Sequence, residues 1–297
     1  MASDDIRCIR TFNRTVAQRL GVLNEKFLGR DRPYVESRLL FEIGENGATV
    51  RDLRARLGID SGFLSRLLRT LERKGLARTQ ESATDRRVRF ARLSRSGAAE
   101  LRRINALSDE LAQSMVAPLT KVQSQRLLTA MTEVERLLRA SSVEIAPEDP
   151  VRADAQACLA QYFAELDERF SSGFDPSKGA NTKDAEEFAA PRGCLLIARL
   201  HGEPVGCGAL HTLEPGIGEI KRMWISPRAR GLGLGRRLLG ELEQVAKKRR
   251  LHTIRLDTNG SLTEALQLYR SSGYREIKRF NDNPYAEHWF EKNLVRP

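Results

Sequence analysis

Three glycines at alternate positions are the most distinctive chemical feature of this sequence. Gly231, Gly233 and Gly235 follow a strand-like run and open an amphipathic helix. Glycines in such a loop allow successive backbone N–H groups to converge on an anion, and the positive end of a helix dipole favours a phosphate there. The spacing therefore predicts a phosphate or pyrophosphate site.

Two other phosphate-binding motifs are excluded by the same spacing. The dinucleotide motif GxGxxG would need a glycine where the sequence has Arg236 or Leu238, and the GxxxxGK[ST] loop is absent. Asp257 stands about twenty residues downstream, where a ribose-binding acid would stand in a dinucleotide fold. Without the motif, that distance carries no prediction.

The motif that fits is RxxGxG, formed by Arg230, Gly233 and Gly235. With the preceding strand, the following helix and the later segment ALQLYRSSGY, residues 142–297 closely resemble the GNAT-type N-acetyltransferases. The resemblance implies an α/β domain with a central mixed sheet, acetyl-CoA as co-substrate and no metal. The expected coenzyme-binding residues are Met223, Trp224, Ile225, Arg230, Gly231, Leu232, Gly233, Leu234, Gly235, Arg236 and Asn259.

The resemblance also implies catalytic roles. An amine must lose a proton before it attacks a thioester, because an alkyl ammonium group has a pKa near 10.4. Glu219 matches the family position that often supplies the base, and Tyr269 matches the general acid that protonates the leaving thiolate. A backbone N–H of Trp224 or Ile225 would stabilise the developing oxyanion where the strand splays. A structural strand carboxylate and a core tyrosine are the alternative interpretations.

Two capping signals frame the helix that carries Tyr269. Ser261 and Glu264 have the spacing of a capping box, and Gly273 suits a C-terminal cap, which predicts a helix over 262–272. Leu262 occupies a position that is often Asn in the family, so we expect Asn259 to supply that contact to the coenzyme.

A polar segment near the C-terminus, RFNDNPYAEHWFEKNL, is expected beside the acceptor site. With two arginines as candidate carboxylate clamps, the acceptor would be a small polar amine such as an amino acid. A polar loop that only covers the sheet edge is the alternative. The expected substrate-binding residues are Arg222, Arg279, Asn281 and Asn283.

The first half of the chain is almost entirely helical in pattern and carries a basic block. Residues 51–95 hold 13 Lys and Arg against 5 Asp and Glu. Within the block, a helix with a leucine stripe presents small residues and arginines on its opposite face, and a basic hairpin follows. The expected DNA-binding residues are Ser61, Gly62, Ser65, Arg66, Arg69, Arg86, Arg87 and Arg89.

The order of these elements strongly resembles the winged helix-turn-helix of MarR-type transcription regulators over residues 5–140. The wing pattern Asp85-Arg86-Arg87 and the closing Leu93-Ser94-x-x-Gly97 carry this resemblance. It implies a homodimer that reads a pseudo-palindromic DNA operator, with the apolar helices at 6–28 and 98–140 as the dimer surface.

Length and composition agree with two domains. The chain has 297 residues and a formal net charge of +11, which favours an anionic partner. The segment SSVEIAPEDP at 141–150 breaks the helical pattern, so we expect a winged-helix domain over 1–141 and an acyltransferase domain over 142–297. The four cysteines form no CxxC pair, and no signal peptide, membrane-length apolar run or metal-ligand spacing is found. We expect a cytoplasmic protein.

The sequence thus predicts a DNA-binding regulator fused to an acetyl-CoA-dependent N-acetyltransferase for a small amine. Two alternatives stay open. The second domain could be a non-catalytic sensor of acetyl-CoA or of an amine that controls DNA binding, or the protein could be a protein acetyltransferase recruited by DNA.

Overall fold

The computed structural model describes residues 3–81, 88–176, 178 and 184–294. The chain divides into two compact units, Met1–Thr129 and Ala130–Pro297. Helix α6 (Lys121–Ser141) crosses this division, which falls before the domain boundary expected between residues 141 and 142. Among the described residues, no helix is long and apolar enough to span a membrane.

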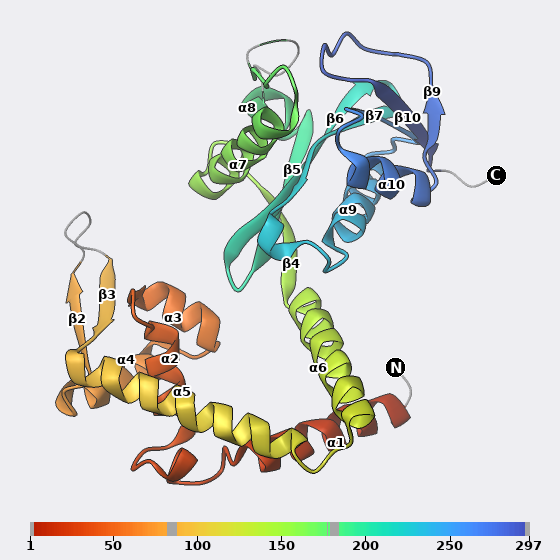
Figure 1. The fold of residues 1–297 in the computed structure, drawn as a ribbon. Coiled ribbons are helices and arrows are strands. Elements are labelled where there is room, and N and C mark those ends of the chain that lie inside the picture. The colour runs from red at the N-terminus through yellow and green to blue at the C-terminus, as the bar shows by residue number, and fades with distance from the viewer. Residues whose placement is uncertain (1–2, 82–87, 177, 179–183, 295–297) are drawn as a thin grey trace. The chain divides into compact units, whose positions relative to one another are not determined.

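The first unit is a winged helix-turn-helix, as predicted (Figure 1). Its three-stranded sheet has the order β1-β3-β2, and β2 and β3 pair antiparallel as the expected hairpin. The elements are α1 (Ser3–Leu20), η1 (Phe27–Gly29), α2 (Tyr34–Ile43), β1 (Ala48–Thr49), α3 (Val50–Leu57), α4 (Ser61–Arg73), β2 (Ala77–Glu81), β3 (Arg89–Leu93) and α5 (Arg95–Val116). The helix expected over 6–28 ends early, because Gly21 adopts a left-handed φ of 66°.

The closing motif of the wing has a packing function. The Ser94 hydroxyl accepts a hydrogen bond from the Gly97 N–H at 3.0 Å and so caps α5. A Cβ atom at Gly97 would lie 1.9 Å from the Leu76 carbonyl oxygen. Glycine at this position therefore lets α5 approach the start of the wing closely.

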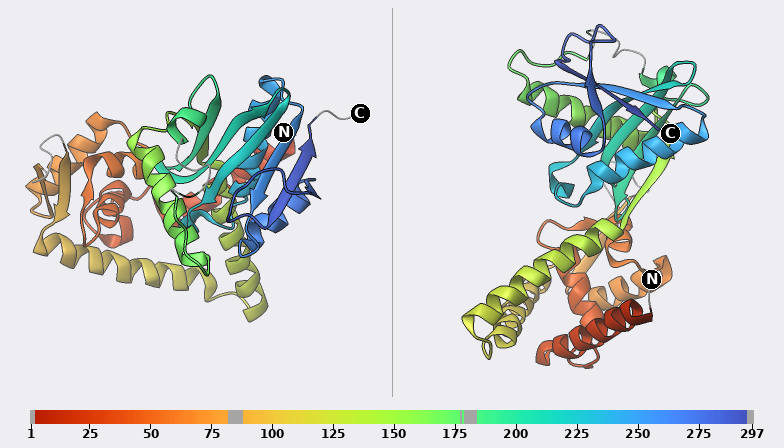
Figure 2. Two further views of the ribbon diagram at one scale, coloured as in Figure 1. Left: turned by 90° about the horizontal axis from the view of Figure 1, so that it is seen from above. Right: turned by 90° about the vertical axis from the view of Figure 1, so that its right-hand side faces the viewer.

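The second unit contains a mixed seven-stranded sheet, which confirms the predicted α/β class (Figures 1 and 2). The strand order is β4-β5-β6-β7-β8-β10-β9, and only β7 and β8 pair parallel. After α6, the elements are β4 (Val143–Glu148), α7 (Ala153–Arg169), α8 (Asp184–Glu187), β5 (Gly193–Leu200), β6 (Glu203–Glu214), β7 (Ile217–Ile225), η3 (Pro227–Ala229), α9 (Leu234–Lys248), β8 (Thr253–Thr258), α10 (Thr263–Ser271), β9 (Arg275–Ile277) and β10 (His288–Asn293).

Helices cover both faces of this sheet. The leucines of α9, among them Leu238 and Leu242, pack with Leu210 of β6 in one cluster, to which Tyr269 also belongs. On the other side, Cys158 and Leu159 of α7 form a second cluster with residues of β5 and β6. The sheet is thus held between two helical layers, and its middle strands are fixed from both sides.

The middle of the sheet opens where the family resemblance implies a splayed strand. The pairing of β7 with β8 covers only Ile217–Glu219, although both strands continue. A register shift in the β6–β7 pairing lies beside Arg222, which has a left-handed φ of 56°. Such a conformation in a non-glycine residue costs about 1–3 kcal/mol and clusters at functional sites. The expected splay of β7 is confirmed.

Candidate functional site

A large cavity lies between the open part of β7 and helices α7, α9 and α10. Its volume is about 600 Å³. Residues from the glycine loop, the end of β7 and α10 line it. They include Met223, Trp224, Ile225, Arg230, Gly231, Gly233, Leu234, Gly235, Arg236 and Tyr269 among the residues expected at the site. Leu232 and Asn259 are not among its lining residues, and Leu232 is buried in a neighbouring cluster.

The glycine loop has the geometry of an anion cradle. Gly231 and Gly233 adopt left-handed φ values of 77° and 73°, and Gly233 is the N-terminal cap of α9. A Cβ atom on either residue would meet nothing within 4 Å, so both glycines border open space. The unpaired N–H groups of the first helical turn and its dipole therefore suit the pyrophosphate of a coenzyme A.

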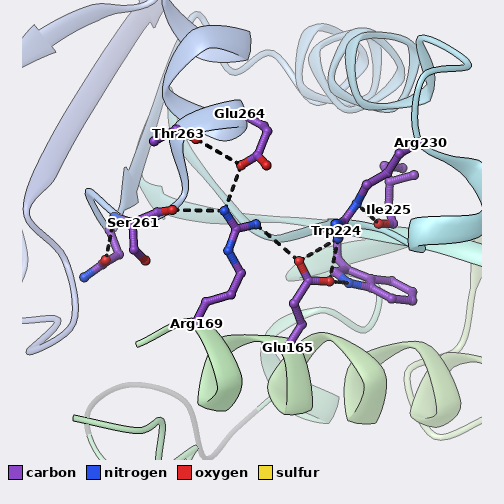
Figure 3. Close-up of polar contacts among 9 residues, drawn as sticks. Glu165, Arg169, Trp224, Ile225, Arg230, Ser261, Thr263 and Glu264 are labelled. Atoms are coloured by element: carbon purple, nitrogen blue, oxygen red, sulfur yellow. Dashed lines mark hydrogen bonds and ion pairs between the residues drawn. The ribbon is translucent and has the colours of Figure 1, made fainter. Parts of the chain in front are cut away.

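Figure 3 shows an ion-pair network at the wall of this cavity. Glu165 of α7 accepts hydrogen bonds from the Arg230 guanidinium and, at 2.8 Å, from the Trp224 indole. Arg169, one turn later, donates to Glu264 of α10 at 2.8 Å. Burial raises the pKa of Glu165, but these arginine and indole contacts outweigh it and hold the pKa below its usual range. Sequence reasoning missed Glu165 and Arg169, because no motif marks them.

The same network overturns one expectation. Ser261 and Glu264 do not form a capping box, since Leu262 is the N-cap of α10 and makes no side-chain cap bond. The Glu264 carboxylate accepts a hydrogen bond from Arg169 at 2.8 Å instead, and this pairing joins α10 to α7. Gly273, with a left-handed φ of 86°, ends the helix as expected.

A smaller cavity of about 70 Å³ lies on the other side of Tyr269. Tyr269 is 5% exposed and lines both cavities. Burial raises the pKa of its phenol well above the usual value, so the group keeps its proton at neutral pH. The small cavity is lined by side chains from β7, β8, α7, α10 and the loop before β10. The lining residues include Phe170, Phe174, Lys221, Asp257, Asn283 and Tyr285.

Glu219 is buried beside this small cavity and is 2% exposed. Its carboxylate lies 2.7 Å from His211 Nε2 and 3.7 Å from Lys221 Nζ, and it accepts a 3.0 Å hydrogen bond from Asn281. Burial alone raises the pKa of Glu219, but the His211 contact, the Lys221 charge and Asn281 outweigh it and lower the pKa. Glu219 is not among the residues that line the cavity.

Asp257, for which sequence analysis made no prediction, does line it. Its two oxygens accept hydrogen bonds of 2.6 Å from the amides of Asn281 and Asn283. Burial and the nearby charge of Glu219 raise the pKa of Asp257, against the opposing effect of the two amides and Lys221. Asn281 and Asn283, expected to contact substrate, therefore hold this carboxylate.

The two arginines expected near the acceptor have different surroundings. Arg222 is 6% exposed, and its guanidinium lies 5.2 Å from the Phe163 ring centroid and 5.8 Å from that of Phe188. Arg279 is exposed and pairs with Asp282 at 2.8 Å. Arg222 is among the residues that line the small cavity and Arg279 is not. Among the described residues, no group of three or more His, Cys, Asp or Glu could hold a metal ion.

The candidate nucleic-acid surface is the outer face of α4. Asp60 caps the helix by accepting a 2.8 Å hydrogen bond from the Phe63 N–H, and four leucines of α4 are buried. This fixes which face is outward. Ser61, Gly62, Arg66, Arg69 and, on β3, Arg89 are exposed, and Ser65 is partly buried. Arg86 and Arg87 lie outside the described residues.

Large apolar side chains are exposed on two helices outside the wing. On α1, Ile6, Ile9 and Phe12 are 44%, 51% and 46% exposed. On α6, five apolar residues are at least 49% exposed, which are Val122, Leu128, Met131, Leu137 and Leu138. Apolar residues repeated along a helix face need a covering surface.

Comparison with known proteins gives a family match in each half of the chain. A model of the acetyltransferase (GNAT) family matches residues 159–274, and a model of the MarR family matches residues 30–88. The chain is 36% identical over 146 residues to the IAA acetyltransferase of Azospirillum brasilense, a match that covers 49% of this chain and 91% of that protein. It is 34% identical over 129 residues to the N-alpha-acetyltransferase RimI of Mycobacterium tuberculosis, over 42% of this chain and 75% of that protein.

Solved structures resemble each half separately. A GNAT acetyltransferase from Elizabethkingia anophelis with acetyl-CoA bound covers 51% of this chain and 98% of its own, with 17% identity and a TM-score of 0.38. Apo MarR from E. coli covers 42% of this chain and 94% of its own, with 24% identity and a TM-score of 0.38.

Proposed function

Because this chain belongs to the GNAT acetyltransferase family through its second unit and carries a MarR-family winged helix in its first, we propose a bifunctional protein. It transfers an acetyl group from acetyl-CoA to the nitrogen of a small amine. As a homodimer, it binds a pseudo-palindromic DNA operator.

The cavity of about 600 Å³ is the observation that carries the enzymatic part. The glycine loop and the N-terminus of α9 form one end of it, and Tyr269 lies at its border with the small cavity. Backbone N–H groups of the loop would hold the pyrophosphate, and acetyl-CoA when bound supplies the acetyl thioester. The buried phenol of Tyr269 remains protonated and can donate its proton to the departing sulfur.

Release of coenzyme A thiol from acetyl-CoA tests this function, with a panel of amino acids and small amines as acceptors. We expect release that depends on a member of the panel and falls by about 100-fold or more in Tyr269→Phe. Coenzyme A affinity, measured by calorimetry, should change little in this variant. If no amine of the panel caused thiol release although coenzyme A still bound, the proposal would be contradicted, and a sensor or a protein substrate would be favoured.

The outward arginines of α4 and β3 support the DNA-binding part. Small residues at the start of α4 permit close approach to a groove, and guanidinium groups contact guanine edges or phosphates. The exposed apolar faces of α1 and α6 support a homodimer. Sedimentation would test the dimer, and titration of an operator against random DNA of equal length would test specificity.

Contacts of α6 favour a second candidate function, in which the coenzyme regulates DNA binding. Arg136 Nη1 donates to the Gly231 carbonyl at 2.6 Å, and Arg139 donates to the Arg228 carbonyl at 3.3 Å. Both arginines lie in the part of α6 that belongs to the second unit, and the same helix starts at Lys121, before the division between the units. Coupling is reciprocal, so coenzyme A would shift operator affinity by the factor with which operator shifts coenzyme A affinity.

Operator titrations with and without saturating coenzyme A test this coupling. We expect a severalfold shift in the wild type and a smaller one in Arg136→Ala. Equal affinities with and without coenzyme A in the wild type would mean two independent functions on one chain.

A further inference from the structure

We propose that Asp257 binds the ammonium group of the acceptor and takes its proton, and that the acceptor is an amine carrying an aromatic group. The inference rests on the proposed acetyl transfer and names a residue and a substrate class for it. Glu219 then becomes a positioning residue, which acts on the reaction through Asp257.

Accessibility separates the two carboxylates. Asp257 lines the small cavity next to Tyr269, whereas Glu219 is buried behind it and is not among the lining residues. A proton acceptor must come within about 2.6–3.2 Å of the proton donor or reach it through one water. Of these two groups, Asp257 is the one that an amine in the cavity could meet directly.

The hydrogen bonds around Asp257 leave it acceptor capacity. The described structure gives each oxygen one hydrogen bond from a loop asparagine, Oδ2 from Asn281 and Oδ1 from Asn283. An ionised carboxylate has about four lone-pair positions, so positions remain for an N–H donor. The amide nitrogen of Asn281 donates to both Glu219 and Asp257, which uses both of its hydrogens and fixes the two carboxylates relative to each other.

The two carboxylates differ in charge preference. Glu219 is held ionised by His211 and Lys221, and its negative charge, together with burial, raises the pKa of Asp257. Pairs of acids whose environments separate their pKa values divide the roles in acid–base catalysis. Glu219 lies behind Asp257, and the charged or titratable side chains that line the small cavity with Asp257 are Lys221 and Arg222 of β7, Tyr162 of α7, Tyr269 of α10 and Tyr285. Lys221 and Arg222 are the positive groups among these lining residues.

Aromatic rings form another part of the cavity wall. Phe170, which directly follows α7, lines it with Phe174 and Tyr285, and the three rings contact each other, with centroid separations of 5.8 Å for Phe170–Tyr285 and 4.9 Å for Phe174–Tyr285. Rings around a carboxylate suit a cation through their negative faces and suit an apolar substituent by packing. A primary amine with a ring on a short arm satisfies both features.

The proposed step balances in protons and electrons. Asp257 takes one proton from the ammonium group and later releases it to solvent. The free nitrogen pair forms the bond to the acetyl carbon, and the carbon–sulfur bond breaks. The second proton of the attacking nitrogen is lost as the amide forms, and Tyr269, which protonates the sulfur, recovers its own proton from that nitrogen. The net products are the amide, coenzyme A thiol and one proton.

Phenethylamine, with ethylamine as the ring-free comparison, is the probe for the test. With the chain of 297 residues, kcat/KM is measured against pH for wild type, Asp257→Asn, Glu219→Gln and the exposed-acid control Glu241→Gln. Phenethylamine affinity is measured by calorimetry with coenzyme A present. We expect Asp257→Asn to lower kcat/KM at pH 7 by about 100-fold and to weaken amine binding by about tenfold. The decrease of kcat/KM that wild type shows as pH is lowered should be absent in this variant.

Glu219→Gln should lower kcat/KM less than Asp257→Asn does. In this variant kcat/KM should still decrease as pH is lowered, but at a lower pH than in wild type, because the charge that raises the pKa of Asp257 is removed. Phenethylamine should exceed ethylamine in kcat/KM by about tenfold or more. A larger loss in Glu219→Gln, or an unchanged acid side in Asp257→Asn, would overturn the assignment of the base. No preference for the ring would overturn the substrate class. Phenethylamine that binds through Asp257 without being acetylated would refute the proposed acetyl transfer but leave the binding site standing.

Discussion

The outward face of the winged helix and the acyltransferase cavity use arginine in opposite ways. On the winged helix, Arg66, Arg69 and Arg89 are exposed, and no carboxylate of the described residues lies within ion-pair distance of them. At the acyltransferase cavity, Arg230 pairs with Glu165 and Arg169 with Glu264. The outward face of α4 and β3 therefore presents positive charge to solvent, whereas the arginines at the cavity join structural elements, as Arg30 does with Glu100 elsewhere in the first unit.

This difference indicates how each of the two surfaces would bind a phosphate group. An exposed guanidinium displaces counterions when it contacts DNA, so its contribution depends steeply on salt. Around the glycine loop, backbone N–H groups and the helix dipole are fixed by the fold. The affinity of such a backbone site for phosphate therefore depends more on the conformation of the loop than on side-chain charge.

Replacing Gly233 with valine should have the largest effect on this comparison. The left-handed φ of 73° disfavours a β-branched residue, and its side chain would enter the cavity. We expect coenzyme A affinity, measured by calorimetry, to fall by about 100-fold while DNA affinity is kept. Gly240→Ala, in open space within α9, is the matched control and should bind coenzyme A normally. Normal coenzyme A binding by the valine variant would argue against a backbone cradle.

Arg66→Ala should have the next largest effect, on DNA. Loss of a contact to a base edge costs about 1–3 kcal/mol of discrimination, equal to roughly 5- to 150-fold for an operator and less for random DNA. Fluorescence anisotropy with both DNAs measures this ratio. Equal losses on the two DNAs would show that Arg66 contacts only phosphates.

Arg89→Ala on the wing should give a smaller, uniform loss. If Arg89 neutralises one phosphate per subunit, affinity should fall severalfold on operator and random DNA alike, and the salt slope should become shallower by about 1 per subunit. Arg87→Ala should behave in the same way. An unchanged salt slope in both variants would show that these wing arginines do not contact DNA phosphates.

Glu219→Gln should have the smallest effect, on the pH dependence of folding. The folded-state pKa of Glu219 lies below its unfolded value, so its ionised form stabilises the fold above about pH 4.3 and this contribution is lost as pH falls. Urea unfolding at pH 7 and near pH 4 should show a smaller acid loss of stability in Glu219→Gln than in wild type. An identical acid loss would mean that the carboxylate is not stabilised in the folded state.

Features that depend on local sequence could be predicted well. The leucine stripe of α4, the hairpin of the wing and the glycine loop follow from periodicity or from motifs within a few residues, whereas the splay of β7 is expected only from the family resemblance. Their backbone geometry is fixed by propensity and by the positions of glycine, which a single sequence displays directly.

Features that depend on tertiary contacts could not be predicted. Glu165 and Arg169 reach the cavity from a helix with no motif, and Asp257 gains its character from Glu219, Asn281 and Asn283, which lie on other elements. Glu264 is a further example, because its carboxylate pairs with Arg169 and does not cap α10 as predicted. Charge partners separated by many residues in sequence are decided by packing, and spacing rules do not report them.

The most direct test of the contrast between the units is the salt dependence of both affinities on one preparation. We expect the logarithm of operator affinity to fall with the logarithm of salt concentration with a slope of about −4 or steeper, and that of coenzyme A affinity with a slope of about −2 or shallower. This would match exposed guanidinium groups in one unit and a backbone cradle in the other. Equal slopes for DNA and coenzyme A would contradict the account.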